Sequence, residues 1–252
     1  RSSDLEYCYL NTTLGKKPYI RVYVNIDDIL ARAKDYINER KPDITVFEGS
    51  ATSDPLPVEP YSGLLKKSIE FFGGEEFGRF RFVTKFTNVD SLLDVNHKGH
   101  TTFRFSINSE IVIRKFEHRT PPLDERIKAA VKVAAAGYPL GFIVGPIFYY
   151  PEWQQEYGHM LESLELQLSG KISAPPAFEL ITHRFTKRAK QNILEVFPKT
   201  QLPLDETDRK FKYGQFGYGK YIYPEAQMAE MKAFFEDKIK ATFPHAQISY
   251  FV

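Results

Sequence analysis

Residues 26–50 read IDDILARAKDYINERKPDITVFEGS, a helix pattern that runs directly into a strand pattern. Apolar side chains recur at spacings of three and four in residues 26–40, behind Asn25, whose side chain we expect to cap the helix. Pro42 stops this helix, because proline cannot continue helical hydrogen bonds. The β-branched and aromatic run in residues 44–50 then predicts a buried strand, which ends in a polar loop. This stretch therefore predicts one helix followed by one strand.

The same alternation continues through most of the chain. The expected elements are helix 61–72, strand 80–85, a short helix 88–93, strand 101–107, helix 123–136, strand 140–147, helix 153–168, strand 177–182, helix 185–196, helix 225–242 and strand 247–252. Strands and helices that alternate in this way predict a parallel sheet with crossover helices, either an open doubly wound sheet or a partial barrel. We find no repeat, low-complexity tract or linker, and expect a single domain over residues 1–252 with a hairpin excursion at 204–223.

The composition limits the class of protein. The chain has 252 residues, of which 42% are apolar and 26% charged, and it has no long uninterrupted apolar run, which excludes a disordered tail and a membrane span. The net charge of +2 means that an acidic partner must meet a local basic patch. Arg1–Leu10 has no apolar signal-peptide core, and Cys8 is the single cysteine, so no intramolecular disulfide can form. Both features favour a cytoplasmic protein.

Residues 204–223 interrupt the alternation. Glycines at 214, 217 and 219 indicate a β-hairpin, and basic side chains alternate with aromatic ones along it. These side chains are Arg209, Lys210, Lys212 and Lys220, and Phe211, Tyr213, Phe216, Tyr218, Tyr221 and Tyr223. Cations can follow a nucleic-acid backbone while aromatic rings stack on unpaired bases. The alternative is a twisted hairpin whose aromatic side chains pack inward.

Polar residues stand at four predicted strand ends, where parallel α/β sheets bind ligands. They are Ser53-Asp54, Lys85, Ser106 to Asn108, and His183-Arg184. Lys85 suits a carboxylate ligand, or is a solvated lysine at a strand end. Ser106 and Asn108 bind a ligand, or cap the following helix. The basic cluster of His183, Arg184, Lys187, Arg188 and Lys190 suits phosphate, or forms a solvated helix face.

Three apparent motifs have simpler explanations. Gly73-Gly74-Glu75 follows a predicted helix, so we expect a turn at the helix end. His97 and His100 lie in a predicted loop and lack a third metal ligand. The hairpin glycines do not stand between a strand and a helix, so they do not indicate a dinucleotide site.

Residues 7–21, YCYLNTTLGKKPYIR, resemble the spore photoproduct lyase family of radical S-adenosylmethionine enzymes, which repair a thymine dimer in spore DNA. Further blocks with the same likeness lie at 47–54, 81–86, 104–108, 178–187 and 219–221, in matching order and spacing. The resemblance covers the C-terminal three quarters of the family chain and implies that a preceding segment and the first strand are absent. It implies an α/β fold, a partial (β/α) barrel of the radical S-adenosylmethionine type with a basic aromatic hairpin.

The resemblance also assigns site residues. Cys8 corresponds to the third thiolate of a CxxxCxxC loop that holds a 4Fe-4S cluster, whose open iron binds the amino and carboxylate groups of S-adenosylmethionine. Reduction then gives an adenosyl radical that abstracts hydrogen from the lesion. The positions that bind or lie beside S-adenosylmethionine are Ser53, Lys85, Ser106, Gly145 and Tyr9. Tyr7 and Tyr9 match family tyrosines near the radical path.

This sequence departs from the family pattern at several positions. Arg1 and Leu5 stand where the other two cluster cysteines are expected, and Ala51 stands where the family has its hydrogen-donor cysteine. Gln215-Phe216 replaces an Arg-Tyr pair that contacts the lesion. Two alternatives to a lesion-repairing lyase therefore stay open: a non-catalytic nucleic-acid-binding relative, and a radical enzyme with another substrate.

The expected partner is double-stranded DNA with a thymine lesion, from which the damaged base is flipped into the barrel mouth of a monomeric protein. The residues expected to face DNA are Arg184, Lys187, Gln215, Phe216 and Tyr218.

Overall fold

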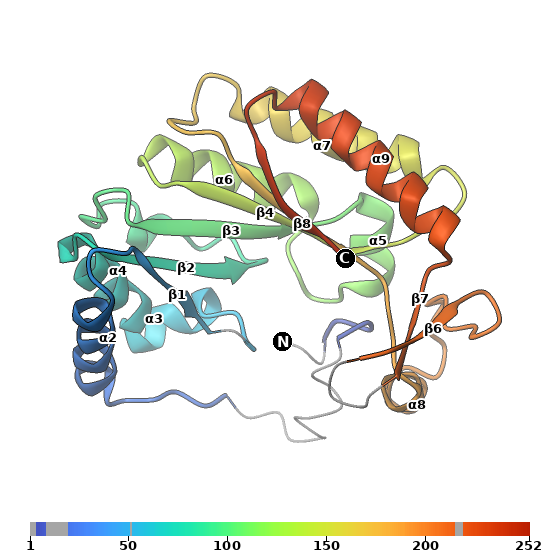
Figure 1. Ribbon diagram of the computed structural model, residues 1–252, viewed down its shortest axis with the longest axis horizontal. Coiled ribbons are helices and arrows are strands. Elements are labelled where there is room, and N and C mark those ends of the chain that lie inside the picture. Colours follow the sequence, from blue (N-terminus) through green and yellow to red (C-terminus); the bar gives the residue numbers. More distant parts are fainter. Residues whose placement is uncertain (1–3, 9–19, 51, 215–218) are drawn as a thin grey trace.

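The computed structural model describes residues 4–8, 20–50, 52–214 and 219–252. Its main sheet has six parallel strands in the order β1-β2-β3-β4-β5-β8 and curls into a half-barrel, which decides between the two predicted sheet types in favour of the partial barrel (Figure 1). The strands are β1 (Thr45–Gly49), β2 (Gly78–Thr84), β3 (Thr101–Ile107), β4 (Leu140–Ile147), β5 (Ala177–Thr182) and β8 (Gln247–Phe251).

Helices cover the convex side of this sheet, as Figure 1 shows for α6 and α7. The helices are α2 (Ile26–Arg40), α3 (Glu59–Ser62), α4 (Leu64–Gly74), α5 (Glu110–Phe116), α6 (Leu123–Ala135), α7 (Trp153–Leu168), α8 (Lys187–Val196) and α9 (Glu225–Thr242), with short 3₁₀ helices at Leu56–Val58 and Asp90–Leu92. Within the described residues, every helix is too short or too polar to cross a membrane.

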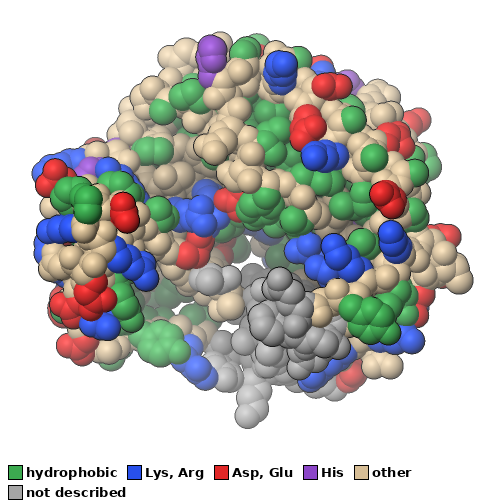
Figure 2. Space-filling view, viewed as in Figure 1, with side chains coloured by type: hydrophobic (Ala, Val, Ile, Leu, Met, Phe, Trp, Pro, Cys, Tyr) green, Lys and Arg blue, Asp and Glu red, His purple; other side chains and the backbone are tan. Residues whose placement is uncertain are grey.

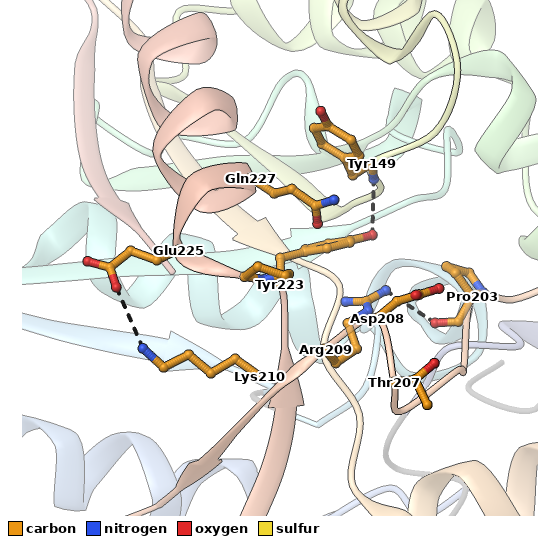
Figure 3. Close-up of a pocket in the computed structure, with 10 residues that line it drawn as sticks. Tyr149, Pro203, Thr207, Asp208, Arg209, Lys210, Tyr223, Glu225 and Gln227 are labelled. Atoms are coloured by element: carbon orange, nitrogen blue, oxygen red, sulfur yellow. Dashed lines mark hydrogen bonds and ion pairs between the residues drawn. The ribbon is translucent and has the colours of Figure 1, made fainter.

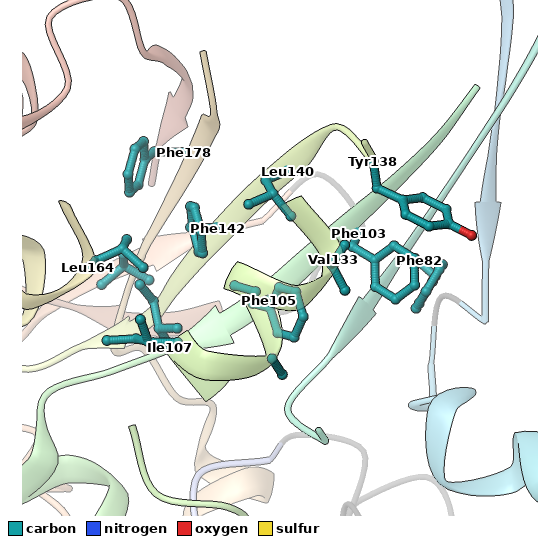
Figure 4. Close-up of a cluster of buried hydrophobic side chains, with 14 of the residues drawn as sticks. Phe82, Phe103, Phe105, Ile107, Val133, Tyr138, Leu140, Phe142, Leu164 and Phe178 are labelled. Carbon is teal, nitrogen blue, oxygen red and sulfur yellow. The ribbon is translucent and has the colours of Figure 1, made fainter. Parts of the chain in front are cut away.

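The core lies between the strands and these helices. Along β3, the side chains of Phe103, Phe105 and Ile107 are fully buried, and Figure 4 shows them among apolar residues from neighbouring strands and helices. Because successive strand residues point to opposite faces, Arg104 and Ser106 face the concave side. The core packing on one face therefore fixes which polar side chains point into the half-barrel.

The local predictions around α2 and α4 need correction. The Asn25 side chain makes no capping hydrogen bond, so the predicted side-chain cap is wrong, although its carbonyl accepts a bond from the Ile29 amide at 3.2 Å. The predicted helix 61–72 is interrupted at Gly63, whose φ of +63° separates α3 from α4. Such a left-handed conformation suits glycine because it has no Cβ.

The segment after β3 also differs from expectation. Helix α5 follows β3 directly and was not among the predicted elements. Its cap is Ser109, whose hydroxyl accepts a hydrogen bond from the Val112 amide at 3.4 Å. Neither Ser106 nor Asn108 therefore has the capping role that the sequence left open. The predicted short helix at 88–93 is a single 3₁₀ turn, Asp90–Leu92.

The Gly73-Gly74-Glu75 tripeptide ends α4, as predicted. A Cβ at Gly73 would lie 2.2 Å from the Asn96 carbonyl oxygen, whereas a Cβ at Gly74 would have no atom within 4 Å. We therefore expect Gly73→Ala to lower the free energy of unfolding by roughly 1–3 kcal/mol, as overpacking does.

Gly74→Ala is the matched control and should leave stability unchanged or slightly higher, because alanine is the better helix former. Chemical denaturation of both variants tests this pair. Equal stabilities would show that the close approach of the 96–97 backbone does not require glycine at position 73.

The two histidines of the predicted loop hydrogen-bond backbone carbonyls. His97 Nε2 lies 3.1 Å from the Ala136 oxygen, and His100 Nδ1 lies 2.9 Å from the Phe72 oxygen. Both side chains thus join loops to neighbouring helices.

The predicted hairpin is present. β6 (Lys210–Tyr213) and β7 (Gly219–Ile222) pair antiparallel beside α8 (Figure 1). Tyr221 and Tyr223 are buried, while Phe211 and Tyr213 are 42% and 78% exposed. The aromatic side chains are therefore divided, with some packed inward and others exposed near the turn.

Candidate functional site

Two predicted ligand residues meet at the carboxyl ends of β2 and β3. Thr84 of β2 pairs with Phe105 of β3, so the next residues, Lys85 and Ser106, are neighbours on the concave face. Lys85 Nζ lies 2.5 Å from Ser106 Oγ. The parallel register thus places these two strand-end residues side by side as a polar pair.

Glu117, which was not among the residues predicted from the sequence, lies at the centre of this site. Its carboxylate accepts hydrogen bonds from the Tyr7 hydroxyl, from Lys85 Nζ at 3.3 Å and from Arg126 Nη2 at 2.6 Å. The side chains of Glu117 and Arg126 have no exposed surface. Two cations therefore share the buried carboxylate of Glu117.

The charge states of the cluster follow from its surroundings. Burial pushes the pKa of Glu117 up, but the charges of Lys85 and Arg126 and the bond from Tyr7 outweigh it and hold that pKa below its usual range. Burial lowers the pKa of Lys85, although Glu117 opposes the shift. Burial and the charge of Glu117 raise the pKa of Tyr7 well above its usual value. The Tyr7 phenol is therefore protonated and donates to an ionised carboxylate.

The loop after β1 is tied to the same site through Asp54. Its carboxylate accepts hydrogen bonds from the Lys85 amide at 2.8 Å, the Thr84 hydroxyl at 3.0 Å and the Leu56 amide at 3.1 Å. Burial raises the pKa of Asp54 even so. Next to it, Ser53 Oγ lies 2.8 Å from Ser50 Oγ. Asp54 thus holds the Ser53 loop against the end of β2, while Ala51 lies outside the described residues.

The segment that contains Cys8 runs past Glu117. Leu5 and Glu117 form an antiparallel bridge, and the Glu6 amide donates to the Phe116 oxygen at 3.0 Å. The Cys8 amide donates to the Leu5 oxygen at 3.1 Å. This pairing brings the Tyr7 ring to 5.9 Å from Lys85 Nζ. Cys8 therefore lies beside the strand-end site, whereas Tyr9 lies outside the described residues.

Gly145 and Asn108 occupy neighbouring strand ends. A Cβ at Gly145 would lie 3.2 Å from the Ile181 Cβ, so a side chain at this position of β4 would press against Ile181 of β5. The Asn108 side chain is buried, donates to the Pro146 oxygen at 2.8 Å and accepts from the Tyr157 hydroxyl at 2.9 Å. Asn108 therefore joins the ends of β3 and β4 to α7.

A second group of charged side chains crosses the concave face below this site. Arg104 Nη1 lies 2.7 Å from Glu179 Oε1, Tyr250 donates to the other Glu179 oxygen at 2.7 Å, and Arg104 also contacts Glu48. A Cβ at Gly141 would lie 2.8 Å from Arg104 Cγ, so the glycine lets Arg104 pass over β4. Arg104 stands two residues before Ser106 in an otherwise apolar strand, so the two side chains share one face. A charged residue inside an apolar strand is the sequence signal that could have located this group.

His183 follows β5 and is held by Arg209. Arg209 Nη1 donates to the His183 oxygen at 2.8 Å, and Nη2 lies 3.2 Å from Nδ1. Because arginine only donates, Nδ1 is the acceptor and the proton of the neutral ring is on Nε2. The ring stacks on Phe148 at 4.6 Å. Burial, and then the charge of Arg209, hold the pKa of His183 well below its usual value.

This environment predicts a pH dependence of stability. Between the lowered folded-state pKa and the unfolded value near 6.5, the unfolded chain binds one more proton, so stability must fall as pH falls below about 6.5. The limiting slope is about 1.4 kcal/mol per pH unit. Urea denaturation of wild type and His183→Phe from pH 7.5 to 5 should show a steeper loss in wild type, and identical pH profiles would contradict this assignment.

The basic side chains that follow β5 differ in whether they form ion pairs. Lys190 and Lys187 lie 3.2 and 4.0 Å from Glu206 carboxylate oxygens. Arg184 is exposed at the strand end. Three further residues expected to face DNA, Gln215, Phe216 and Tyr218, lie outside the described residues.

A cleft of about 540 Å³ lies at the base of the hairpin. Figure 3 shows Arg209 next to Tyr223, over whose ring the guanidinium lies at 3.6 Å, and Lys210 paired with Glu225. The cleft contains acidic, basic and aromatic side chains, and none of Lys85, Ser106 or Glu117 lines it.

Comparison with known proteins gives one consistent result. The sequence model of the spore photoproduct lyase family matches residues 2–252. The spore photoproduct lyase of Clostridium acetobutylicum is 55% identical over 247 residues, which are 98% of this chain and 73% of the relative. That of Bacillus subtilis is 51% identical over 97% of this chain and 72% of its own length.

Solved structures agree. A spore photoproduct lyase complexed with dinucleoside spore photoproduct, and a mutant lyase with bound AdoMet and the same dinucleoside, each superimpose with a TM-score of 0.94 at 51% identity. Each match covers 99% of this chain and 73% of the solved chain. With this identity, this coverage and the same half-barrel, the chain belongs to the spore photoproduct lyase family.

Proposed function

We propose that this chain is a lyase that acts on the spore photoproduct, a thymine lesion of DNA, with S-adenosylmethionine (AdoMet) as its cofactor. The observation that carries this proposal is the Lys85, Ser106 and Glu117 cluster, which places a buried ammonium group beside a hydroxyl at the strand ends. Relatives at 51–55% identity support it, as do solved relatives that hold AdoMet and the dinucleoside lesion.

The donors present fit the methionine end of AdoMet. The Lys85 ammonium is desolvated and partly neutralised, so it can pair with the cofactor carboxylate. The hydroxyls of Ser106 and Ser53 provide adjacent donors and acceptors, and Gly145 leaves the neighbouring strand end without a side chain. We place Tyr9 and Tyr7 beside the same ligand. Bound AdoMet would supply the adenosyl group that takes a hydrogen atom from the lesion, once an external one-electron reductant has cleaved its sulfonium carbon–sulfur bond and released methionine.

The residues present do not fit a three-thiolate iron–sulfur cluster. Cys8 is the single cysteine of the sequence, Arg1 and Leu5 stand at the other two ligand positions, and neither can act as a thiolate. Cys8 is well placed to provide one thiolate ligand, because the segment that contains it pairs with Glu117 beside Lys85. We therefore derive no step through a cluster held by these residues alone.

We assign the DNA-facing side of the molecule to the hairpin and to the segment after β5. In this proposal Arg184, which lies between β5 and α8, and Lys187, at the start of α8, contact the duplex. Gln215, Phe216 and Tyr218, outside the described residues, are proposed as DNA contacts from the sequence alone. A lesion must leave the base stack to reach Lys85 at the strand ends. We propose a monomeric protein of the cytoplasm that works on double-stranded DNA in the spore core.

The test is anaerobic incubation of the chain, after iron and sulfide reconstitution, with AdoMet, a reductant and the dinucleoside spore photoproduct. Chromatography should show conversion of the lesion together with AdoMet cleavage. Failure to bind either small molecule would contradict the proposal.

A second candidate is a nucleic-acid-binding relative without radical chemistry. The single thiol of the sequence and Ala51 at the hydrogen-donor position favour it. Binding of the dinucleoside with no iron uptake and no conversion would support this candidate over the lyase.

A further inference from the structure

Arg126 is a buried arginine near the start of α6, behind the strand-end site. Figure 2 shows a hollow inside the half-barrel, with Lys and Arg side chains at its border, through which a ligand can enter. The side chain of Arg126 has no exposed surface, so it cannot touch a ligand in this hollow. Any effect of Arg126 on the site must therefore act through the residues that it holds.

The guanidinium of Arg126 donates hydrogen bonds to four acceptors. Nε donates to the Pro121 oxygen at 2.9 Å, and Nη1 donates to the Ser106 oxygen at 3.0 Å. Nη2 donates to Thr120 Oγ1 at 2.8 Å and to Glu117 Oε2 at 2.6 Å. Three of these acceptors belong to the segment that follows α5, and the fourth is at the end of β3. Arg126 thus joins two parts of the site with a planar fork of donors that lysine does not have.

The two carboxylate oxygens of Glu117 have separate partners. Oε2 accepts from Arg126, whereas Oε1 accepts from Lys85 Nζ at 3.3 Å and from the Tyr7 hydroxyl. Because one oxygen is held by a rigid donor, the other is kept toward Lys85. Lys85 Nζ also lies 2.5 Å from Ser106 Oγ, and Arg126 binds the backbone of that serine. Arg126 therefore fixes both neighbours of the Lys85 ammonium.

We propose that Arg126 is a positioning residue, which holds the Lys85 ammonium and the Ser106 hydroxyl in the arrangement that receives the carboxylate of AdoMet. This inference rests on the proposed function, in which these two groups bind the cofactor. Groups that are held in place before binding lose less freedom when the ligand arrives, so their alignment contributes to affinity. Against the upward effect of burial, the charges of Lys85 and then Arg126 lower the pKa of Glu117, so this carboxylate stays ionised.

The first test is isothermal titration calorimetry of the Arg126→Lys variant with AdoMet. Lysine keeps the charge, but its single ammonium cannot serve Ser106, Glu117 and Pro121 at once. We expect AdoMet affinity to fall about tenfold, the lower end of the effect that residues orienting metal ligands have on metal affinity. An unchanged affinity would overturn the proposal.

Arg209→Lys is the matched control. Arg209 is a half-buried arginine that also binds the backbone oxygen of a strand-end residue, His183, but it shares no partner with Lys85. Its substitution should lower stability in urea, while AdoMet affinity stays within about twofold of wild type, because distant sites without shared partners act independently.

A double-mutant cycle separates positioning from a general loss of structure. If Arg126 acts through Lys85, then Arg126→Lys in a Lys85→Met background should lower AdoMet affinity by less than about threefold, because the ammonium that Arg126 holds is already absent. A further tenfold loss in this background would overturn the proposal. If Arg126→Lys does not fold, Thr120→Val takes its place, since it removes one acceptor of the fork. Loss of that hydrogen bond should lower affinity about threefold, and an unchanged affinity would count against the proposal equally.

A crystal structure of Arg126→Lys gives a readout that does not need the cofactor. We expect Glu117 Oε1 to turn away from Lys85, and the separation of Lys85 Nζ from Ser106 Oγ to increase from 2.5 Å to beyond hydrogen-bond distance. The same arrangement as in wild type would overturn the positioning role. Absence of AdoMet binding by wild type would instead contradict the proposed function, and this structure would still decide whether Arg126 positions Lys85.

Discussion

Glu117→Ala should destabilise this protein by about 3–5 kcal/mol, because removal of one partner of a buried charge network leaves uncompensated charges in the interior. Lys85 and Arg126 would lose their shared carboxylate, and Tyr7 would lose its acceptor. The Glu117 carboxylate also bonds Tyr7 in the segment 4–8, which contains Cys8. Loss of this carboxylate should therefore also release residues 4–8 from the end of α5. Urea denaturation at pH 7.5 measures the first effect, and limited proteolysis near the N-terminus measures the second.

Glu110→Ala is the matched control, since this exposed residue begins the same helix that ends before Glu117. It should change stability by no more than about 0.5 kcal/mol. Acid sensitivity gives a second check with a defined sign. The folded-state pKa of Glu117 is lowered, so its contribution is present above about pH 4.5 and is lost as pH falls through the folded value. A variant as stable as wild type would contradict the central role of Glu117.

Lys85→Met should reduce AdoMet affinity by about 10- to 100-fold. A charge-assisted hydrogen bond contributes about 1.5–3 kcal/mol, and about 1.4 kcal/mol corresponds to a tenfold change in affinity. Methionine keeps most of the volume of the lysine chain, and Glu117 keeps its bond to Arg126, so the fold should survive.

Isothermal titration calorimetry with AdoMet measures this effect, with Lys66→Met as the control for a lost positive charge. Affinities within twofold of wild type for Lys85→Met would remove this residue from the proposed cofactor site.

Much of the fold follows from hydrophobic periodicity. The ends of strand 140–147, helix 153–168 and helix 225–242 coincide with β4, α7 and α9. These segments are long or uniformly apolar, and packing against the sheet agrees with their local pattern. The alternation of strands and helices therefore determines the parallel sheet before any contact is known.

The errors arise where backbone conformation or tertiary contacts decide. Gly63 adopts a left-handed conformation inside an apparently continuous helix pattern. Helix α5 is only seven residues long, too short for periodicity to separate it from a loop. Its cap, Ser109, lies one residue after Asn108 and three after Ser106, the expected candidates. Local propensity is weak evidence for such short elements.

The candidate site, too, could be predicted from the sequence only in part. Strand order places Lys85 beside Ser106, so that pair could be predicted from the parallel sheet alone. Glu117 and Arg126 could not be predicted, because Glu117 lies 32 residues from Lys85 and reaches it through the path of the chain after α5. No spacing in the sequence indicates that approach.

The most direct test of the proposed cofactor site is a crystal structure of the chain grown with AdoMet. We expect density for the cofactor at the carboxyl ends of β1 to β3, with its carboxylate within hydrogen-bonding distance of Lys85 Nζ and its remaining polar groups near Ser53 and Ser106. Density in the cleft beside Arg209 and Tyr223, with the strand ends empty, would contradict it.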